Sequence, residues 1–362
     1  MGNRDRMSDL GILAIQIMAG CLAERNIRML AELDAAPTEG VDVGSVSIVV
    51  PARDEAQRLP ALLASLARLR YPNRELIVVD DGSTDGTGDL ASAAGARVIR
   101  LEGPPPGWTG KCYACHIGAQ AASGEWLLFV DADTVHAPAS LGLALAASSE
   151  SKASLLSLLP RQRCQTFWER LLVPYAHALY FVGAIGINQP GGPAIANGQY
   201  LLFRRSDYQR IGGHEAVRGS VIEDVMLARL ARDHGLPVIL LRADEQLEVR
   251  MYEDLPSLWE GFGKNAFRFM RSSPLNGALT VIATVAFSSA LPAAFRARSV
   301  WLRLALLLAP AAALVPWMRR FRVPIRFSLL HPLAAGVFQL IALDSVRRTF
   351  LHRGTLWKGR RY

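Results

Sequence analysis

Cysteine is scarce in this chain, and its scarcity excludes one class of protein. Four cysteines among 362 residues are too few for a scaffold built on disulfides and indicate a reducing compartment. Two of them belong to the run C-Y-A-C-H at residues 112–116, which is the attachment pattern of a c-type haem and contains the C-x-x-C of redox dithiols and zinc sites. A zinc site of four ligands would need a second such pair, because His116 supplies only a third ligand.

A recognisable export signal is also missing from the first residues. Residues 9–23 are apolar, but the charges of Arg4, Asp5 and Arg6 before them are mixed in sign. The run is shorter than the ~20 residues that span a bilayer. We therefore expect an interfacial helix or a packed helix here. Because a c-type haem is attached only after export, we expect residues 112–116 to carry no haem and their thiols to pack on one face of a helix.

Charge is the third scarce property. Charged residues make up 20% of the chain and hydrophobic residues 51%, and the mean hydropathy is +0.18. This composition is more apolar than that of most soluble enzymes and predicts membrane segments. The formal net charge of +8 suits nucleic acid, an anionic membrane surface or a phosphorylated substrate.

The middle of the chain, residues 45 to about 270, alternates strand-like and helix-like segments. The β-rich runs at 45–50, 74–80 and 125–130 are separated by segments with helical apolar spacing. This rhythm predicts an α/β domain with a mostly parallel central sheet. Ligands of such sheets bind beyond the carboxyl ends of the strands, and the acidic clusters of this chain follow two of those ends.

The C-terminal third holds three apolar runs, at 275–295, 299–318 and about 324–345. Each has the length of a membrane helix, although buried helices of a soluble domain are the alternative. Basic residues flank the runs and crowd the tail. Two crossings would put both flanking clusters on the cytoplasmic side, whereas a third would send the tail outside, against the positive-inside rule. We therefore expect the last run to be re-entrant or interfacial, broken at Pro332. The predicted division is an N-terminal helix and linker (1–44), a catalytic domain (45–270) and membrane helices with a tail (271–362).

Two acidic pairs end two of the predicted strands, Asp80-Asp81 and Asp131-Ala132-Asp133. A single strand-end carboxylate often caps the next helix, but two pairs at one sheet edge repel each other unless a cation or polar donors offset the charge. Mg²⁺ and Mn²⁺ are commonly held by one or two carboxylates together with substrate phosphates. The pairs therefore predict a divalent cation and a nucleoside diphosphate at this edge.

The motifs "SIVVPARDEAQRLPALLASL", "LIVVDDGSTDGT" and "WLLFVDADT" resemble, in order and spacing, those of family 2 glycosyltransferases over about residues 45–250. The resemblance implies the GT-A fold and an inverting transfer. It implies that Asp131 and Asp133 hold Mg²⁺ or Mn²⁺, with Asp133 as the main metal ligand. It also implies a set of residues around the donor nucleotide: Pro51, Ala52, Arg53, Glu55, Asp80, Asp81, Lys111 and Asp131.

The pair Glu223-Asp224 begins a predicted amphipathic helix. Acids at a helix start also complement the helix dipole. The resemblance instead places the catalytic carboxylate in such a pair, and transfer to a hydroxyl requires a general base. We expect Asp224 to be that base, with Glu223 supporting it.

The segment at 257–267, "SLWEGFGKNAF", replaces the Q-x-x-R-W motif of processive members of the family. This departure argues against a polysaccharide synthase. Trp259, Lys264 and Asn265 are candidate contacts to the acceptor or the diphosphate. An amphipathic interfacial helix is an equally good interpretation of this segment.

The stretch around Lys111, the 257–267 segment, the C-terminal apolar runs and the closing "WKGRRY" resemble bacterial carotenoid- and hopanoid-associated glycosyltransferases. This predicts transfer from a nucleotide sugar, chiefly UDP-glucose, to a membrane-dissolved isoprenoid lipid, with no nucleic-acid partner. The enzyme would sit in the inner, cytoplasmic membrane with its catalytic domain in the cytoplasm. The alternatives are a polyprenyl-phosphate sugar transferase or glycolipid synthase and, remotely, a membrane redox or haem protein using residues 112–116.

Overall fold

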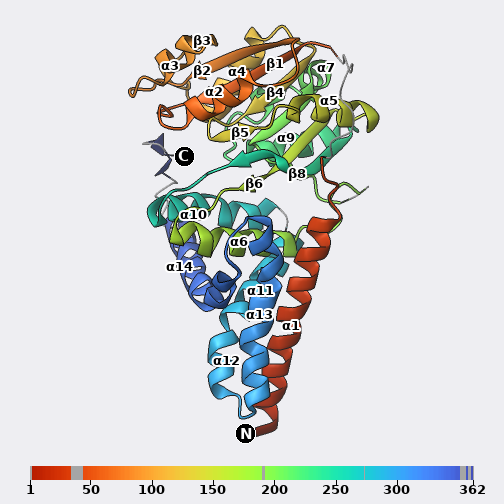
Figure 1. Ribbon diagram of the computed structural model, residues 1–362, viewed down its shortest axis with the longest axis vertical. Coiled ribbons are helices and arrows are strands. Elements are labelled where there is room, and N and C mark those ends of the chain that lie inside the picture. Colours follow the sequence, from red (N-terminus) through yellow and green to blue (C-terminus); the bar gives the residue numbers. More distant parts are fainter. Residues whose placement is uncertain are drawn as a thin grey trace. The chain divides into compact units, whose positions relative to one another are not determined.

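The structure, a computed structural model, describes residues 2–33, 44–189, 192–272, 274–350, 356–357 and 360–361. Two compact units share the chain (Figure 1). The sheet unit comprises Leu30–Arg161 and Ala194–Arg250, and the helical unit comprises Met1–Met29, Gln162–Pro193 and Met251–Tyr362. This division differs from the sequence-based one, because residues 162–193 and 251–270 group with the helical unit rather than with the catalytic domain.

The sheet unit is built on an eight-stranded sheet with the order β3-β2-β1-β4-β7-β6-β8-β5. Its first four strands run parallel; they are β1 (Val46–Ala52), β2 (Arg74–Asp80), β3 (Arg97–Arg100) and β4 (Trp126–Val130). The crossovers between them are α2 (Leu59–Ala67), α3 (Thr87–Ala93) and α4 (Gly110–Ala121). The alternation predicted from the sequence is therefore confirmed in this half of the sheet (Figure 1).

The other half of the sheet is antiparallel. Strand β7 (Tyr200–Arg204) pairs antiparallel with β4 and with β6 (Leu155–Gln162), and β5 (Thr134–His136) pairs antiparallel with β8 (Val238–Val249). The sheet is thus mixed, where a mostly parallel one was predicted. The remaining helices of this unit are α5 (Ser140–Glu150), α7 (Arg205–Arg210), α8 (Gly213–Ala216) and α9 (Glu223–Asp233).

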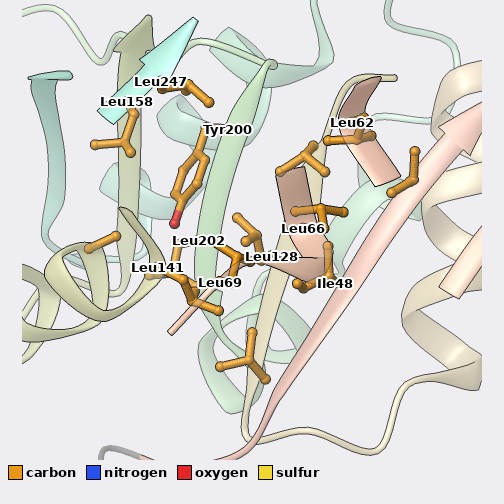
Figure 2. Packing of buried hydrophobic residues seen from close by; sticks show 14 of the residues in the cluster. Ile48, Leu62, Leu66, Leu69, Leu128, Leu141, Leu158, Tyr200, Leu202 and Leu247 are labelled. Carbon is orange, nitrogen blue, oxygen red and sulfur yellow. The ribbon is translucent and has the colours of Figure 1, made fainter. Parts of the chain in front are cut away.

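Apolar side chains fill both faces of the sheet, which explains why its strands read as continuous apolar runs. On one face Ile48 and Leu128 pack with Leu62 and Leu66 of α2 (Figure 2). The opposite face is covered in part by α4. A Cβ added at Gly118 of that helix would lie 2.3 Å from Val49 Cγ1, so a glycine is required for this close approach of helix to sheet.

The helical unit contains seven α-helices and one short 3₁₀ helix among its described residues: α1 (Gly2–Arg28), α6 (Phe167–Val182), α10 (Leu255–Ser272), α11 (Pro274–Ser288), α12 (Ala290–Arg296), α13 (Val300–Arg320), η1 (Ile325–Leu330) and α14 (His331–Phe350). Further along, β9 (Leu356–Trp357) and β10 (Arg360–Arg361) pair antiparallel.

Within the described residues, three helical stretches are long and apolar enough to cross a membrane: Met7–Arg28, Val300–Arg320 and Ile325–Arg348. The pair Gly277–Ser288 and Ala290–Arg296, bent by 42°, adds a fourth if it counts as one broken span. The expectation that the N-terminal run is too short is wrong. Its helix, Gly2–Arg28, continues past the apolar run at both ends, and the polar Asn26 beyond the run is buried inside the bundle.

Contacts between helices show in which direction the helices of this unit run relative to one another. Arg296 pairs with Asp9 at 3.4 Å, and Gln16 Nε2 donates to the Ala286 carbonyl at 2.8 Å. The bent pair α11–α12 therefore runs antiparallel to α1. Helix α13 begins at Val300, soon after Arg296, and its Ala313 lies beside Gly20 of α1, where an added Cβ would be 2.5 Å from the Ala313 Cβ. The helix therefore runs parallel to α1 (Figure 1).

The last apolar run, which forms η1 and α14, does not extend along the full length of α13. Phe321, just past the end of α13, packs on Trp317 with ring centroids 6.2 Å apart. His331, the first residue of α14, lies deeper, with Nε2 3.0 Å from the Leu307 carbonyl. Helix α14 then returns to α10, where Ser345 Oγ donates to a carbonyl at 2.6 Å. The segment thus enters and leaves the bundle at the same end.

Large apolar side chains on the helical unit face outward. Phe295 and Trp301 are each 78% exposed, Val285 is 55% exposed and Leu308 is 51% exposed. Polar side chains such as Gln16, in contrast, are buried. Such a surface is stable only if something apolar covers it.

Candidate active site

The loops after β1 and β2 lie side by side at one edge of the sheet and are tied together. Arg53 Nη1 donates to the Asp81 carbonyl at 2.8 Å, and the Asp81 amide donates to the Ala52 carbonyl at 2.8 Å. The next residue, Asp54, has a left-handed φ of 49°, and its neighbour Glu55 donates its amide to Thr87 Oγ1 at 2.8 Å. The predicted nucleotide-binding residues that follow β1 and β2, Pro51 included, therefore lie together at this edge and form one side of a cradle.

Asp80 and Asp81 follow β2, as predicted, and are 5% and 4% exposed. Asp80 Oδ1 accepts the Ser83 amide at 2.9 Å. Its other oxygen would lie 2.5 Å from a Cβ added at Gly88. Asp80 therefore stabilises the turn into α3. Through this turn it would support the loop after β2 indirectly.

Asp131 and Asp133 follow β4. Asp133 Oδ1 is buried and has no hydrogen-bond partner in the described part of the chain. Burial, followed by the charges of Asp131 and Glu55, raises the pKa of Asp133 to about 7. A carboxylate in this setting lacks an adequate positive partner, so the protein alone does not stabilise its ionised form.

These oxygens fit a hard divalent cation. No group of three His, Cys, Asp or Glu side chains within the described ranges is arranged to hold a metal ion by itself. Mg²⁺ typically binds through one or two carboxylates and completes its shell with water and substrate phosphates. Asp131 and Asp133 therefore suit a cation that arrives with a nucleoside diphosphate.

Lys111 bridges Asp131, on the predicted metal side, and Glu223 of the predicted catalytic pair Glu223-Asp224. Thr109 caps α4 by accepting the Cys112 amide at 3.3 Å, and this cap places Lys111 in the first turn. Its Nζ lies 2.8 Å from Asp131 Oδ1 and 2.8 Å from Glu223 Oε1. Burial alone would lower the pKa of Lys111, but the two carboxylates outweigh it and raise that pKa well above its usual value. The ammonium is therefore charged and shared between both groups.

Glu223 and Asp224 begin α9, as predicted. The Gly198 amide donates to Asp224 Oδ2 at 2.8 Å, and the Val225 amide donates to Oδ1 at 2.8 Å. Burial, followed by the charge of Glu223, raises the pKa of Asp224 to about 6 against the opposing effect of Lys111. A carboxylate held firmly by the backbone, with a pKa near the working pH, is suited to general-base chemistry.

Gly198 belongs to the site, and its role did not follow from sequence reasoning. A Cβ added here would lie 3.0 Å from Lys111 Nζ, 3.2 Å from Glu223 Oε1 and 3.3 Å from Asp224 Oδ2. The absence of a side chain therefore allows the backbone to approach three polar groups closely. The segment "NGQY" was the available signal, but a glycine before a strand is equally consistent with a turn.

The C-x-x-C-H run lies on α4, and the prediction that its thiols pack there is confirmed. Cys112 and Cys115 are both 0% exposed, and Cys115 belongs to the core between sheet and helices. Burial raises the pKa of Cys112 to about 12, which leaves it a poor nucleophile and metal ligand. His116 points elsewhere, against Trp108, with ring centroids 4.9 Å apart.

The candidate acceptor residues lie in the helical unit, on α10. Trp259 Nε1 donates to Asp344 Oδ2 of α14 at 2.9 Å, so its indole N–H is used inside this unit. Lys264 and Asn265 lie in the same helix, but their side chains are outside the described residues. Their predicted contacts to the acceptor or diphosphate remain predictions.

Residues 47–212 match the family model described as Glycosyl transferase family 2. A 4,4'-diaponeurosporenoate glycosyltransferase of Staphylococcus haemolyticus is 30% identical over 248 residues, which span 66% of this chain and 65% of that relative. The enzyme of the same name from Staphylococcus aureus strain USA300 is 28% identical over 343 residues, 88% of each chain. A solved mannosyltransferase, PcManGT of Pyrobaculum calidifontis in complex with GDP-Man and Mn²⁺, aligns with TM-score 0.57 at 20% identity, covering 92% of this chain and 97% of its own. The likeness in fold confirms the predicted GT-A architecture.

Proposed function

The chain is a glycosyltransferase whose residues 47–212 form a domain of glycosyl transferase family 2, and from this premise we propose that it transfers a sugar, with inversion, from a nucleoside-diphosphate sugar to a hydrophobic isoprenoid lipid. The observation that carries the proposal is the convergence around Lys111. Its ammonium contacts Asp131 on the donor side and Glu223 on the base side, at 2.8 Å each. A metal-and-donor group and an acid–base group are thereby held in one site.

Asp224 is the proposed general base. Its two oxygens are fixed by backbone amides at 2.8 Å each, so the carboxylate is oriented before the acceptor arrives. It would take the proton from the acceptor hydroxyl while that oxygen attacks the anomeric carbon and the bond to the diphosphate breaks. Glu223, adjacent in sequence, keeps Lys111 in place.

The donor side is the cradle after β1, β2 and β4. Asp131 and Asp133 would hold Mg²⁺ or Mn²⁺, which when bound offsets the charge of the diphosphate. The proposed nucleotide contacts are Pro51, Ala52, Arg53, Glu55, Asp80, Asp81, Lys111 and Asp131. UDP-glucose is the donor that we favour, with GDP- and dTDP-sugars as the other candidates.

The acceptor is proposed to be a carotenoid or hopanoid type of lipid. The two staphylococcal relatives are named for transfer to diaponeurosporenoate, which supports an apolar polyene acid or alcohol here. The outward apolar side chains of the helical unit give independent support, because an acceptor that is insoluble in water must be collected from a bilayer.

The helical unit is the proposed membrane anchor. Its described spans include α1 and α13, and basic residues stand at the same end of both: Arg25, Arg28, Arg319 and Arg320. By the positive-inside rule that end faces the cytoplasm. We propose that the protein lies in the inner membrane, with the segment from Phe321 to Phe350 re-entrant from the cytoplasmic side.

A screen of nucleotide sugars with membranes containing the protein, followed by mass spectrometry of the lipids, tests this function. We expect a hexose on an isoprenoid lipid, dependent on a divalent cation. A sugar on a polyprenyl phosphate or a glycerolipid would instead favour the rival acceptors. Nucleotide-sugar turnover that is indifferent to cation and to lipid would contradict the proposal.

A further inference from the structure

A buried polar chain runs beneath the D-x-D turn and is used by none of the steps above. It begins at the Asp131 carbonyl, which accepts the Thr134 amide at 3.2 Å and Thr134 Oγ1 at 2.8 Å. It continues to His136, whose Nε2 lies 3.0 Å from the same hydroxyl. Thr134 is 0% exposed and His136 is 2% exposed, so water does not compete for these bonds.

The direction of each bond follows from the count of protons. A threonine hydroxyl has one proton, and the Thr134 proton goes to the Asp131 carbonyl. We therefore assign His136 Nε2 as the donor to Thr134 Oγ1. This places the imidazole proton on Nε2 and leaves Nδ1 bare; Nδ1 is buried without a partner in the described ranges.

The backbone of His136 is held by another element, helix α2. The His136 amide donates to Ser65 Oγ at 3.1 Å, and Ser65 Oγ donates to the Leu62 carbonyl at 2.7 Å. Both of these residues belong to α2. The Tyr200 ring lies against the imidazole, with centroids 5.8 Å apart. Burial lowers the pKa of His136 to about 3, so the ring stays neutral through the working pH range.

We propose that His136 is a positioning residue for the donor site: through the Thr134 hydroxyl it fixes the Asp131 carbonyl, and so the D-x-D turn that carries Asp131 and Asp133. This inference rests on the proposed function, because it assumes that the two carboxylates bind a cation with the donor. Hydrogen-bond partners of ligand groups commonly determine metal affinity in this way. Because Nδ1 has no hydrogen-bond partner among the described residues, we infer that the role of His136 depends on the hydrogen bond of its Nε2.

The experiment compares matched substitutions in the full chain in detergent. Thr134→Val removes the hydroxyl at constant shape, and Thr134→Ser keeps it. His136→Leu removes the donor, whereas the amide of His136→Gln reaches the position of Nε2. Binding of Mn²⁺ in the presence of UDP is measured by isothermal titration, with the thermal unfolding midpoint as the measure of folding.

We expect Thr134→Val and His136→Leu each to weaken Mn²⁺ binding by about 10-fold or more, and the Ser and Gln variants to bind nearly as tightly as the wild type. The double variant should be no weaker than either single one, because both break the same chain. Unchanged Mn²⁺ affinity in Thr134→Val and His136→Leu, or a loss that follows the unfolding midpoint in all four variants, would overturn the inference. Wild-type protein that binds no Mn²⁺ with UDP, GDP or dTDP would instead overturn the proposed function.

Discussion

The two units of this protein place similar side chains in opposite ways. In the sheet unit, large apolar residues are inside, as Ile48 and Phe129 show at 1% and 2% exposure. In the helical unit, Phe295 and Trp301 are outside at 78% exposure, while Gln16 is inside at 0%. A chain can expose so much apolar surface only where its surroundings are apolar too. The difference indicates that the sheet unit is suited to water and the helical unit to apolar surroundings.

Buried polar groups are also used differently in the two units. In the helical unit the Gln16 and Asn26 amide groups donate to backbone carbonyls of neighbouring helices at 2.8 Å and 2.7 Å, which is a structural use. In the sheet unit the Asp133 carboxylate is buried with one oxygen unpaired. An unpaired buried carboxylate oxygen is costly, and at this strand end, beside Asp131, it marks a place where a ligand can complete the structure.

The largest expected effect is on the sheet-unit side of this contrast. Asp224→Asn should reduce sugar transfer by about 100- to 10,000-fold, the range attributed to a general base, because the amide cannot take the acceptor proton. Binding of UDP with Mn²⁺ should persist, since the donor cradle is untouched. Transfer rates and UDP affinity measured on the same preparation decide it. Full activity in this variant would remove Asp224 from the mechanism.

A smaller loss should follow from removing the link between the two carboxylate groups. Lys111→Met keeps the apolar stem but loses the ammonium shared by Asp131 and Glu223, and we expect transfer to fall by about 100-fold. The matched control is Cys112→Ala with Cys115→Ala on the same helix, which should leave catalysis nearly intact. If the cysteine variant fell as far as the lysine variant, helix packing rather than charge would explain both.

The contrast between the two units can be tested directly with one arginine substitution in each. Leu308 is 51% exposed on α13 and Leu90 is 40% exposed on α3. Arginine at 308 should impair membrane insertion, with a cost of about 3 kcal/mol at the middle of a span, whereas Leu90→Arg should change stability by no more than about 0.5 kcal/mol. The yield in the membrane fraction and the unfolding midpoint report the two effects. Equal tolerance at both positions would contradict the membrane assignment.

The pH dependence of transfer should follow the proposed base. The pKa of Asp224 is raised to about 6, and a base works only when ionised. Activity should therefore be level above about pH 7 and fall about tenfold per pH unit below about pH 6. The profile of kcat/KM is measured at saturating Mn²⁺, because a bound cation keeps Asp133 ionised. A flat profile down to pH 5 would argue against Asp224.

The smallest expected effect is on stability. The pKa of Asp133 is raised to about 7, so its ionised form is disfavoured in the folded, metal-free protein and the penalty grows as the pH rises. Asp133→Asn removes it and should raise the unfolding midpoint by about 2–4 °C above pH 7, with no gain near pH 4. Metal affinity should be lost in the same variant. Melting curves across pH, without metal, make the comparison; a lower midpoint at every pH would contradict it.

The sequence predicted the parallel half of the sheet because each strand, crossover and strand-end acid there is local. The placement of Asp133 and Asp224 at strand and helix ends was predicted for the same reason. The antiparallel half depends on pairings such as β4 with β7, far apart in the chain, which periodicity does not specify. Likewise, Gly198 and the His136–Thr134 chain gain their roles only from neighbours that the fold brings to them.

The full length of α1 could also not be predicted from the sequence. Asp9 and Asn26 read as the polar limits of a short run, yet each is buried by a partner from another part of the chain: Arg296 for Asp9 and the Phe181 carbonyl for Asn26. Composition marks where a helix is apolar, whereas its true ends depend on contacts that satisfy its polar residues.

The helical unit is assembled from three separate stretches of the chain, and this has a consequence for synthesis. Helix α1 leaves the ribosome early, but the surface around Gly20 that receives Ala313 must wait until nearly all of the polypeptide has been made. During that interval the sheet unit has time to fold, since domains generally fold as units while the chain grows. The order of translation thus makes α13 and α14 the pieces that close a bundle whose first helix is already in place.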